Sequence, residues 1–311
     1  MSEEKIADNQ TNKAVKSIDN FVATLLERLN NHEYSLTGVP TGITELDELT
    51  NGLQKSDLII LAARPSEGKT SFAMTVAANA AIKYGKNVLF FSLELDGVQF
   101  TQRLLSSQAQ IDQRRLSKGI LNSDEIKKLC ASIKPINQAP LFVDDSAGID
   151  VIELMSKARE LKRKDSLDLL LIDNLHLMNA DTKEYHTTAI REITRKLKLL
   201  AKELQIPIIA LAQLSSKDYD QYRDCPQLSD LRETGSIEQF ADMVWFIERQ
   251  FMQTHRDEDR YKATLIVAKN RNGSTTNIDL SIVPEYMTFY DATDNQQDDY
   301  QYDETTDFGS F

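Results

Sequence analysis

A turn containing Gly68-Lys69-Thr70 lies between an apolar run and a helical period, and this order constrains the fold more than any other feature of the chain. The apolar run predicts a strand over Asp57–Ala63, and the spacing of apolar residues after the turn predicts a helix over Thr70–Tyr84. In a strand, loop and helix of this kind, backbone N–H groups and the helix N-terminus bind phosphate. We therefore expect Lys69 to reach the β- and γ-phosphates of a nucleotide and the Thr70 hydroxyl to hold Mg²⁺.

Eight residues form the predicted phosphate-binding loop for ATP: Ala63, Arg64, Pro65, Ser66, Glu67, Gly68, Lys69 and Thr70. The match is imperfect, because the general pattern has glycine where this chain has Ala63, and because Glu67 places a carboxylate beside the anion. A Glu67 side chain that points inward would weaken ATP binding, whereas one that points to solvent would change little. The Gly-Lys-Thr tripeptide alone is also compatible with an ordinary helix start, so the flanking strand and helix decide for the phosphate loop.

The rest of the chain alternates between short apolar runs and helical periods, which predicts an α/β fold with a mostly parallel twisted sheet and helices on both faces. The later strands have few helices between them and predict an antiparallel extension of this sheet. The further predicted strands are Val88–Ser92, Leu141–Val143, Asp168–Asp173, Ile208–Gln213, Met243–Ile247, Thr264–Lys269 and Ile278–Val283, and the further predicted helices are Val98–Ser107 and one with apolar residues from Ile190 to Leu204.

Polar side chains follow three of the predicted parallel strands at their carboxyl ends, where ligands bind in sheets of this type. Glu94 is placed to act as general base on an attacking water, and Asp173 is suited to support Mg²⁺. Gln213 is placed to sense the γ-phosphate. Each residue also has an ordinary structural alternative: a helix cap for Glu94, a turn aspartate for Asp173 and a solvated side chain for Gln213.

The negative net charge of the chain does not by itself exclude nucleic acid as a partner, because the charge is unevenly distributed. The formal net charge is -12, from 36 basic and 48 acidic residues among 311. Residues 291–311 contain no Lys or Arg and account for seven of the twelve excess negative charges. The body is therefore mildly acidic, which permits a local basic path for nucleic acid without supporting one.

The composition also indicates in which cellular compartment the protein functions. The sequence has no apolar run of about 18 residues and no signal-peptide pattern, so we expect a cytoplasmic protein without a membrane partner. Cys130 and Cys225 are too few for a disulfide framework or a zinc cluster.

Three segments are expected along the chain. Residues 1–35 would contain a polar tail and an amphipathic helix, because Val15, Ile18, Val22, Leu25 and Leu29 form one apolar stripe. This helix would cover either its own domain or a neighbouring subunit. Residues 36–290 would form the α/β domain, and residues 291–311 a disordered acidic tail.

The chain resembles the RecA-like motor domain of the DnaB family of replicative hexameric DNA helicases. The resemblance covers the amphipathic helix and the region from Thr37 to about Tyr290. It rests on seven strings in family order: 41–47 (TGITELD), 63–70 (ARPSEGKT), 92–94 (SLE), 171–173 (LID), 212–215 (AQLS), 228–239 (LSDLRETGSIEQ) and 269–273 (KNRNG). The family also tolerates alanine in place of the first glycine of the phosphate loop.

The resemblance implies further site residues. Arg271, with Lys269, looks like an arginine finger that reaches in trans to the γ-phosphate bound by the adjacent subunit. Gln213 would couple the nucleotide state to the DNA loops. The resemblance also implies that Arg232, Glu233, Thr234 and Gly235 form a loop that grips the backbone of single-stranded DNA in a central channel. From the residues alone, 269–271 also fit a solvated hairpin, and 232–235 a helix start capped by Asp230.

The resemblance implies an ATP-dependent helicase or translocase that acts on single-stranded DNA as a homo-hexameric ring in DNA replication, with a helicase loader or other replication proteins as further partners. The alternative is a RecA-like ATP-binding accessory protein that unwinds little. About 14 residues precede the amphipathic helix, so we expect no N-terminal collar domain.

Overall fold

The computed structural model describes residues 22, 36–178, 186–214, 225–234 and 236–292. Residues Met1–Leu36 and Thr37–Phe311 form two separate units, and the fold described here belongs to the second. The predicted amphipathic helix, apart from Val22, and the acidic segment 293–311 lie outside the described residues.

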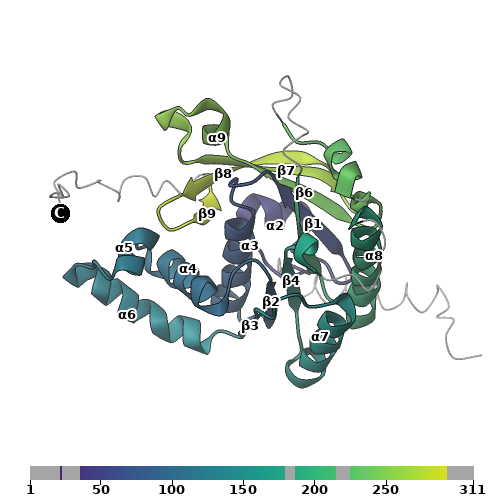
Figure 1. Ribbon diagram of the computed structural model, residues 1–311, viewed down its shortest axis with the longest axis horizontal. Helices are drawn as coiled ribbons and strands as arrows, with labels where there is room; N and C mark the ends of the chain where they lie inside the picture. Colours follow the sequence, from purple (N-terminus) through teal and green to yellow (C-terminus); the bar gives the residue numbers. More distant parts are fainter. Residues whose placement is uncertain (1–21, 23–35, 179–185, 215–224, 235, 293–311) are drawn as a thin grey trace, which may run out of the picture. The chain divides into compact units, whose positions relative to one another are not determined.

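Within these residues, nine strands form one sheet in the order β3-β2-β4-β5-β1-β6-β7-β8-β9 (Figure 1). All pairs from β3 to β6 are parallel, and the pairs from β6 to β9 are antiparallel. The predicted α/β sheet with an antiparallel extension is therefore confirmed. The strands are β1 (Leu58–Ala63), β2 (Val88–Ser92), β3 (Leu141–Asp144), β4 (Leu169–Asp173), β5 (Ile208–Gln213), β6 (Met243–Glu248), β7 (Lys262–Asn270), β8 (Thr276–Val283) and β9 (Thr288–Asp291).

Helices cover both faces of the sheet because alternate residues of a buried strand point to opposite sides. Ile59 and Leu61 of β1 pack in the cluster that contains α3 and α4, whereas Leu58 and Ile60 pack in the cluster that contains α7 and α8. The helices are α2 (Thr44–Thr50), α3 (Lys69–Ala78), α4 (Gly97–Ala109), α5 (Gln113–Lys118), α6 (Ser123–Gln138), α7 (Val151–Asp165), α8 (His186–Leu204) and α9 (Gln250–Thr254). None of the described helices is both long enough and apolar enough to cross a membrane.

The helix predicted over Thr70–Tyr84 consists of two pieces, α3 and a π-helical segment over Asn79–Lys83. Short 3₁₀ segments cover Leu175–Leu177, Leu228–Thr234, Ile237–Gln239 and Asp257–Asp259.

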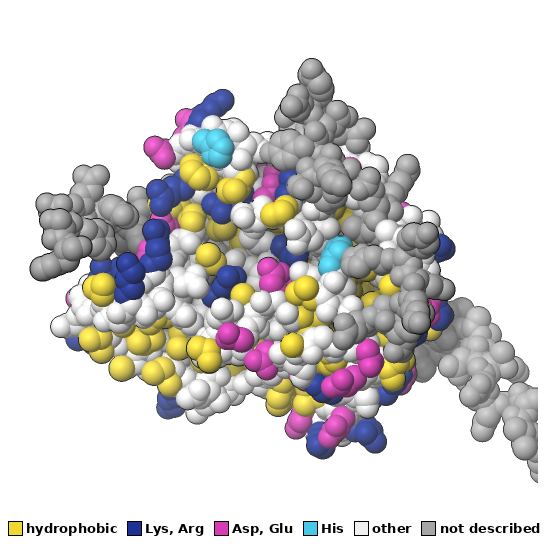
Figure 2. Space-filling view, in the orientation of Figure 1, with side chains coloured by type: hydrophobic (Ala, Val, Ile, Leu, Met, Phe, Trp, Pro, Cys, Tyr) yellow, Lys and Arg dark blue, Asp and Glu magenta, His cyan; other side chains and the backbone are white. Residues whose placement is uncertain are grey.

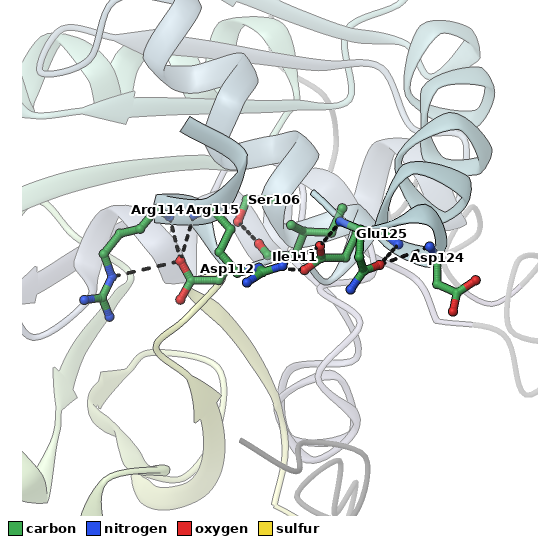
Figure 3. A network of polar contacts seen from close by, with 8 residues as sticks. Ser106, Ile111, Asp112, Arg114, Arg115, Asp124 and Glu125 are labelled. Atoms are coloured by element: carbon green, nitrogen blue, oxygen red, sulfur yellow. Dashed lines mark hydrogen bonds and ion pairs between the residues drawn. The ribbon is translucent and has the colours of Figure 1, made fainter. Parts of the chain in front are cut away.

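The paired helices α5 and α6 were not predicted, although their start signals are local. Asp112 caps α5, and the Asn122 side chain and Glu125 form a capping box at the start of α6. The guanidinium of Arg115 joins the two helices through two 2.9 Å hydrogen bonds to the Glu125 carboxylate (Figure 3). Capping thus stabilises the start of each helix, and one bidentate ion pair links the two.

Apolar side chains remain exposed along this helix pair. Figure 2 shows hydrophobic side chains gathered at the lower left, over α6. Ile120, Ile126 and Ile133 are each more than two fifths exposed. A cluster of this kind is more typical of a contact surface than of free solvent-facing surface.

The last strand, β9, was also not predicted. Its residue Phe289 lies next to Gly68 of the phosphate loop. The Phe289 ring packs edge-on against Phe72 of α3 at 5.5 Å between centroids. The next strand residues end at Asp291, which the sequence interpretation placed in the tail. Its carboxylate accepts hydrogen bonds from the Thr44 N–H (2.8 Å) and hydroxyl (2.6 Å) at the start of α2. Asp291 therefore belongs to the folded sheet.

Candidate nucleotide site

Four strand ends meet at one edge of the sheet, because β2, β4, β5 and β1 are adjacent and parallel. The residues at or just after these ends are Glu94, Asp173, Gln213 and Ala63. Ser92 pairs with Asp173, and Ala63 pairs with Gln213. The fold thus brings together the phosphate loop and the three polar residues that the sequence placed at strand ends.

The phosphate loop is closed by Gly68, whose φ of +92° is disfavoured for any residue with a Cβ. An added Cβ would also lie 2.9 Å from Cζ of Phe289. Lys69 follows as the first residue of α3 and is buried. The loop therefore leads directly into the N-terminus of α3, which is the arrangement that binds phosphate in loops of this type.

Asp173 connects the phosphate loop to the neighbouring strands. Its Oδ2 accepts a 2.6 Å hydrogen bond from the Thr70 hydroxyl, and its Oδ1 lies 3.8 Å from Nζ of Lys69. Burial raises the pKa of Asp173, and the Lys69 charge and the Thr70 hydrogen bond oppose this rise. Its buried Oδ1 has no hydrogen-bond partner in the described part of the chain. A hydroxyl beside a carboxylate with one uncommitted oxygen fits Mg²⁺.

Glu94 stands outside β2 at the same edge, with an exposed side chain. Its Oε2 accepts a 3.1 Å hydrogen bond from the Asn174 amide. The N-cap of α4 is Asp96, whose side chain accepts from the Gln99 N–H, so Glu94 is not the helix cap considered as its alternative. Asp173 likewise is a buried residue bonded to the loop and not a free turn aspartate.

Gln213 has an exposed side chain, and its backbone N–H donates to Nδ1 of His176 at 3.5 Å. His176 in turn follows Asn174, whose Oδ1 accepts from the His176 N–H at 3.0 Å. The sequence did not identify Asn174 as part of the site, whereas His176 stands out in the sequence because it differs from what the DnaB family usually shows beside phosphate and metal.

Arg103 of α4 is a further residue that the sequence did not identify. Its side chain lines a small pocket together with Ser71 and Thr75 of α3, and it also lines an open cavity of about 290 Å³ together with Gln99 and Gln113. Its charge opposes the rise in the pKa of Asp173. One feature of the sequence could have identified Arg103. It is a cation directly before Leu104, which is one of the buried residues of the amphipathic helix α4.

Of the two orientations considered for Glu67, burial excludes the one that points to solvent. The side chain is 3% exposed, and its Oε2 accepts a 3.2 Å hydrogen bond from the Arg64 N–H at the start of the same loop. Burial raises the pKa of Glu67 to about 7, and the neighbouring Glu248 also raises it, whereas the Arg64 hydrogen bond and the charges of Arg64 and Arg249 lower it. The carboxyl thus braces the loop from within.

We expect Glu67→Gln to change how stability depends on pH. Because the pKa of Glu67 rises from 4.5 to about 7 on folding, its contribution to stability is fully present below about pH 4.5 and is lost as the pH rises through 7. Relative to the variant, the unchanged protein should therefore lose about 2 kcal/mol of unfolding free energy between pH 5 and pH 8. Urea unfolding at both pH values measures this difference, with Glu258→Gln as the control for one lost charge. Equal pH dependence in protein and variant would contradict the burial of Glu67.

Lys269 and Arg271 lie at the opposite edge of the sheet. Arg271 pairs with Asp242 at 3.2 Å, and Asp242 also accepts a hydrogen bond from the Leu58 N–H at the amino end of β1. Nζ of Lys269 donates to the carbonyls of Glu238 (2.7 Å) and Ala241 (2.8 Å). Burial and the charge of Arg271 lower the pKa of Lys269. Neither cation reaches the phosphate loop of its own chain.

The predicted DNA loop is described only in part. The backbone of Arg232, Glu233 and Thr234 belongs to the 3₁₀ segment that begins at Leu228, but their side chains and the whole of Gly235 lie outside the described residues. The side chain of Asp230 accepts from the Gln227 N–H at 2.8 Å.

Comparison with known proteins places the chain among helicase domains. The model of the DnaB-like helicase C-terminal domain family matches residues 38–291. The replicative DNA helicase DnaB of Geobacillus stearothermophilus is 40% identical over 266 residues, which are 85% of this chain and 59% of that protein. The replicative DNA helicase DnaC of Bacillus subtilis is 39% identical over 290 residues, which are 92% of this chain and 64% of that protein. The chain thus spans about three fifths of the length of these relatives.

Solved structures agree with the sequence comparison. The ATPase domain of G40P superposes with a TM-score of 0.82 at 34% identity, covering 88% of this chain and 98% of that one. A DnaB-like replicative helicase, described with its interactions with primase, superposes with a TM-score of 0.81 at 33% identity, covering 88% of this chain and 66% of that one. The predicted RecA-like fold is therefore confirmed.

Proposed function

Because this chain belongs to the DnaB-like helicase C-terminal domain family, we propose that it is an ATP-hydrolysing DNA helicase that acts on single-stranded DNA as a homo-hexameric ring during replication in the cytoplasm. The observation that supports this most directly is the single edge of the sheet that carries Lys69, Thr70, Asp173 and Glu94. These are the parts that phosphoryl transfer to water requires: a phosphate clamp, a cation site and a base.

Each residue of this edge has a defined task in the proposed reaction. The loop N–H groups and Lys69 bind and orient the β- and γ-phosphates. Thr70 and Asp173 hold Mg²⁺, which neutralises charge on the phosphates when bound. Glu94 accepts the proton of the attacking water. Gln213, at the end of the neighbouring strand, lies where the loss of the γ-phosphate changes its surroundings.

In the proposed reaction, a second subunit supplies the arginine that contacts the γ-phosphate. Lys269 and Arg271 face away from the loop of their own chain, so we propose that Arg271 acts on the nucleotide of a neighbour. In a ring, the segment 232–235 of each copy would face one strand of DNA and contact its phosphates. The exposed isoleucines of α6 support assembly, because clustered apolar side chains at a surface are commonly covered by another subunit.

A forked-duplex assay with ATP tests the proposal, with the mass of the assembled species measured in parallel. We expect ATP-dependent strand separation by a hexamer and a DNA-stimulated ATPase. Lys69→Ala should reduce that ATPase to below about 1% of the unchanged rate, because it removes the cation on the transferred phosphate. Nucleotide binding without DNA-stimulated turnover would instead identify an accessory protein of a helicase and overturn the proposal.

A further inference from the structure

The Glu94 carboxylate accepts a hydrogen bond from the buried side-chain amide of Asn174, which directly follows β4. We propose that Asn174 is a positioning residue for Glu94 in ATP hydrolysis. This inference rests on the function proposed above, since it assigns a role to Glu94 as base. Three features of the contact support this inference. Within the described ranges, Glu94 has one hydrogen-bond partner, Asn174 is buried and hydrogen-bonded, and the oxygen and nitrogen of the Asn174 amide bind different partners.

Glu94 has little else to orient it. Its side chain is exposed beyond the end of β2, and Oε2 accepts from Nδ2 of Asn174 at 3.1 Å. Among the described residues, the carboxylate accepts no other hydrogen bond and makes no ion pair. A general base must lie within hydrogen-bond reach of the proton that it takes. An exposed carboxylate with one anchor therefore depends on that anchor for its position.

Asn174, in contrast, is rigidly placed. It is 4% exposed and follows Asp173 directly at the end of β4. Its Oδ1 accepts from the His176 N–H at 3.0 Å, and its backbone carbonyl accepts from the Leu177 N–H at 3.2 Å. His176 is fixed in turn by the Gln213 N–H at the end of β5. The hydrogen bonds thus run across three adjacent strand ends and finish at Glu94.

The oxygen and the nitrogen of the Asn174 amide have different partners. A substitution can therefore remove the contact with Glu94 without breaking the turn that follows Asn174. Oδ1 closes the turn over residues 174–177, and Nδ2 holds Glu94. Asn174→Asp has nearly the same shape and keeps the acceptor for the His176 N–H. It loses the donor and places a second carboxyl group beside Glu94, so it removes the positioning contact while preserving the turn.

Steady-state ATPase assays on the full chain with DNA test this role. We expect Asn174→Asp to lower kcat by about tenfold or more, because a base displaced by about 1 Å loses much of its efficiency. The dissociation constant of a fluorescent ATP analogue should change by less than about threefold, since the loop and Lys69 are untouched. Asn174→Ala, which also opens the turn, should lower kcat at least as much.

A double variant separates positioning of Glu94 from any other effect. In a Glu94→Gln background there is no base to place, so adding Asn174→Asp should change the residual rate by less than about twofold. A further tenfold loss in that background would overturn the inference, as would an unchanged or increased kcat for the single variant. If the unchanged protein itself hydrolyses no ATP, the proposed function fails, and this result is distinct from failure of the Asn174 role.

Discussion

Replacing Arg271 with alanine is expected to lower the DNA-stimulated rate of ATP hydrolysis by about 10³-fold, the size of the effect of an arginine supplied in trans to related phosphate-loop enzymes. Within one chain the guanidinium lies beside Asp242, at the amino end of β1, whereas Lys69 follows the carboxyl end of that strand. Six strand residues separate the two edges by about 20 Å. Under the proposed function Arg271 acts on a neighbour's nucleotide, and its loss should leave nucleotide affinity within about threefold.

Mixing of subunits provides the sharper measurement of the same prediction. Lys69→Ala subunits keep the finger, and Arg271→Ala subunits keep the phosphate loop, so a mixed ring regains complete sites at some interfaces. In an equimolar random mixture about a quarter of the interfaces would be complete, because each site uses a different surface of each neighbour. We expect ATPase activity well above that of either variant alone. Arg256→Ala, which removes an exposed arginine paired with Glu258, is the control. No recovery in the mixture would contradict a shared site.

The second large effect is expected from Glu94→Gln. An amide does not take a proton from water at neutral pH, so kcat should fall by about 10³-fold, within the range that general bases contribute. The amide oxygen still accepts a hydrogen bond from Asn174, so the surrounding strand ends should keep their places. Nucleotide affinity, measured by titration with a fluorescent ATP analogue, should change by less than about threefold, because the proposed phosphate contacts of the loop and Lys69 are untouched.

Glu45→Gln provides the matched control for this variant, since it removes an exposed carboxylate from α2, away from the strand ends. Its ATPase rate should equal that of the unchanged protein. A Glu94→Gln protein that retains more than about a tenth of the rate would exclude Glu94 as the base and leave water activation to another group.

Much of the sheet could be predicted because its strands are locally marked. The strands β2 and β5 have the predicted bounds, and β1 begins one residue later than predicted. Fully buried parallel strands appear as short continuous apolar runs, which a sequence displays directly. The residues at their ends, Glu94, Asp173 and Gln213, could be placed together because parallel strands share one carboxyl edge.

The helix α6 and the strand β9 were not predicted, for two different reasons. The start of α6 was signalled by the Asn122 and Glu125 spacing, so that miss was avoidable. The strand β9 is four residues long and lies at the edge of the sheet, next to a segment of acidic composition. Its assignment depends on pairing with β8 and on Phe289 packing against Phe72, which are contacts between distant parts of the chain.

The sequence by itself determined the strand, glycine-containing loop and helix around Gly68, the parallel order of strand and helix, and the polar strand ends, because each depends on spacing within one short segment. Only the tertiary structure decided which side chains meet: the buried Glu67 carboxylate accepts from the Arg64 N–H of its own loop, Thr70 donates to Asp173, and Asn174 donates to Glu94. These contacts join elements that are adjacent in the sheet and distant in sequence, or they depend on burial that the whole core creates. Periodicity and spacing carry no information about such neighbours, so packing alone assigns them.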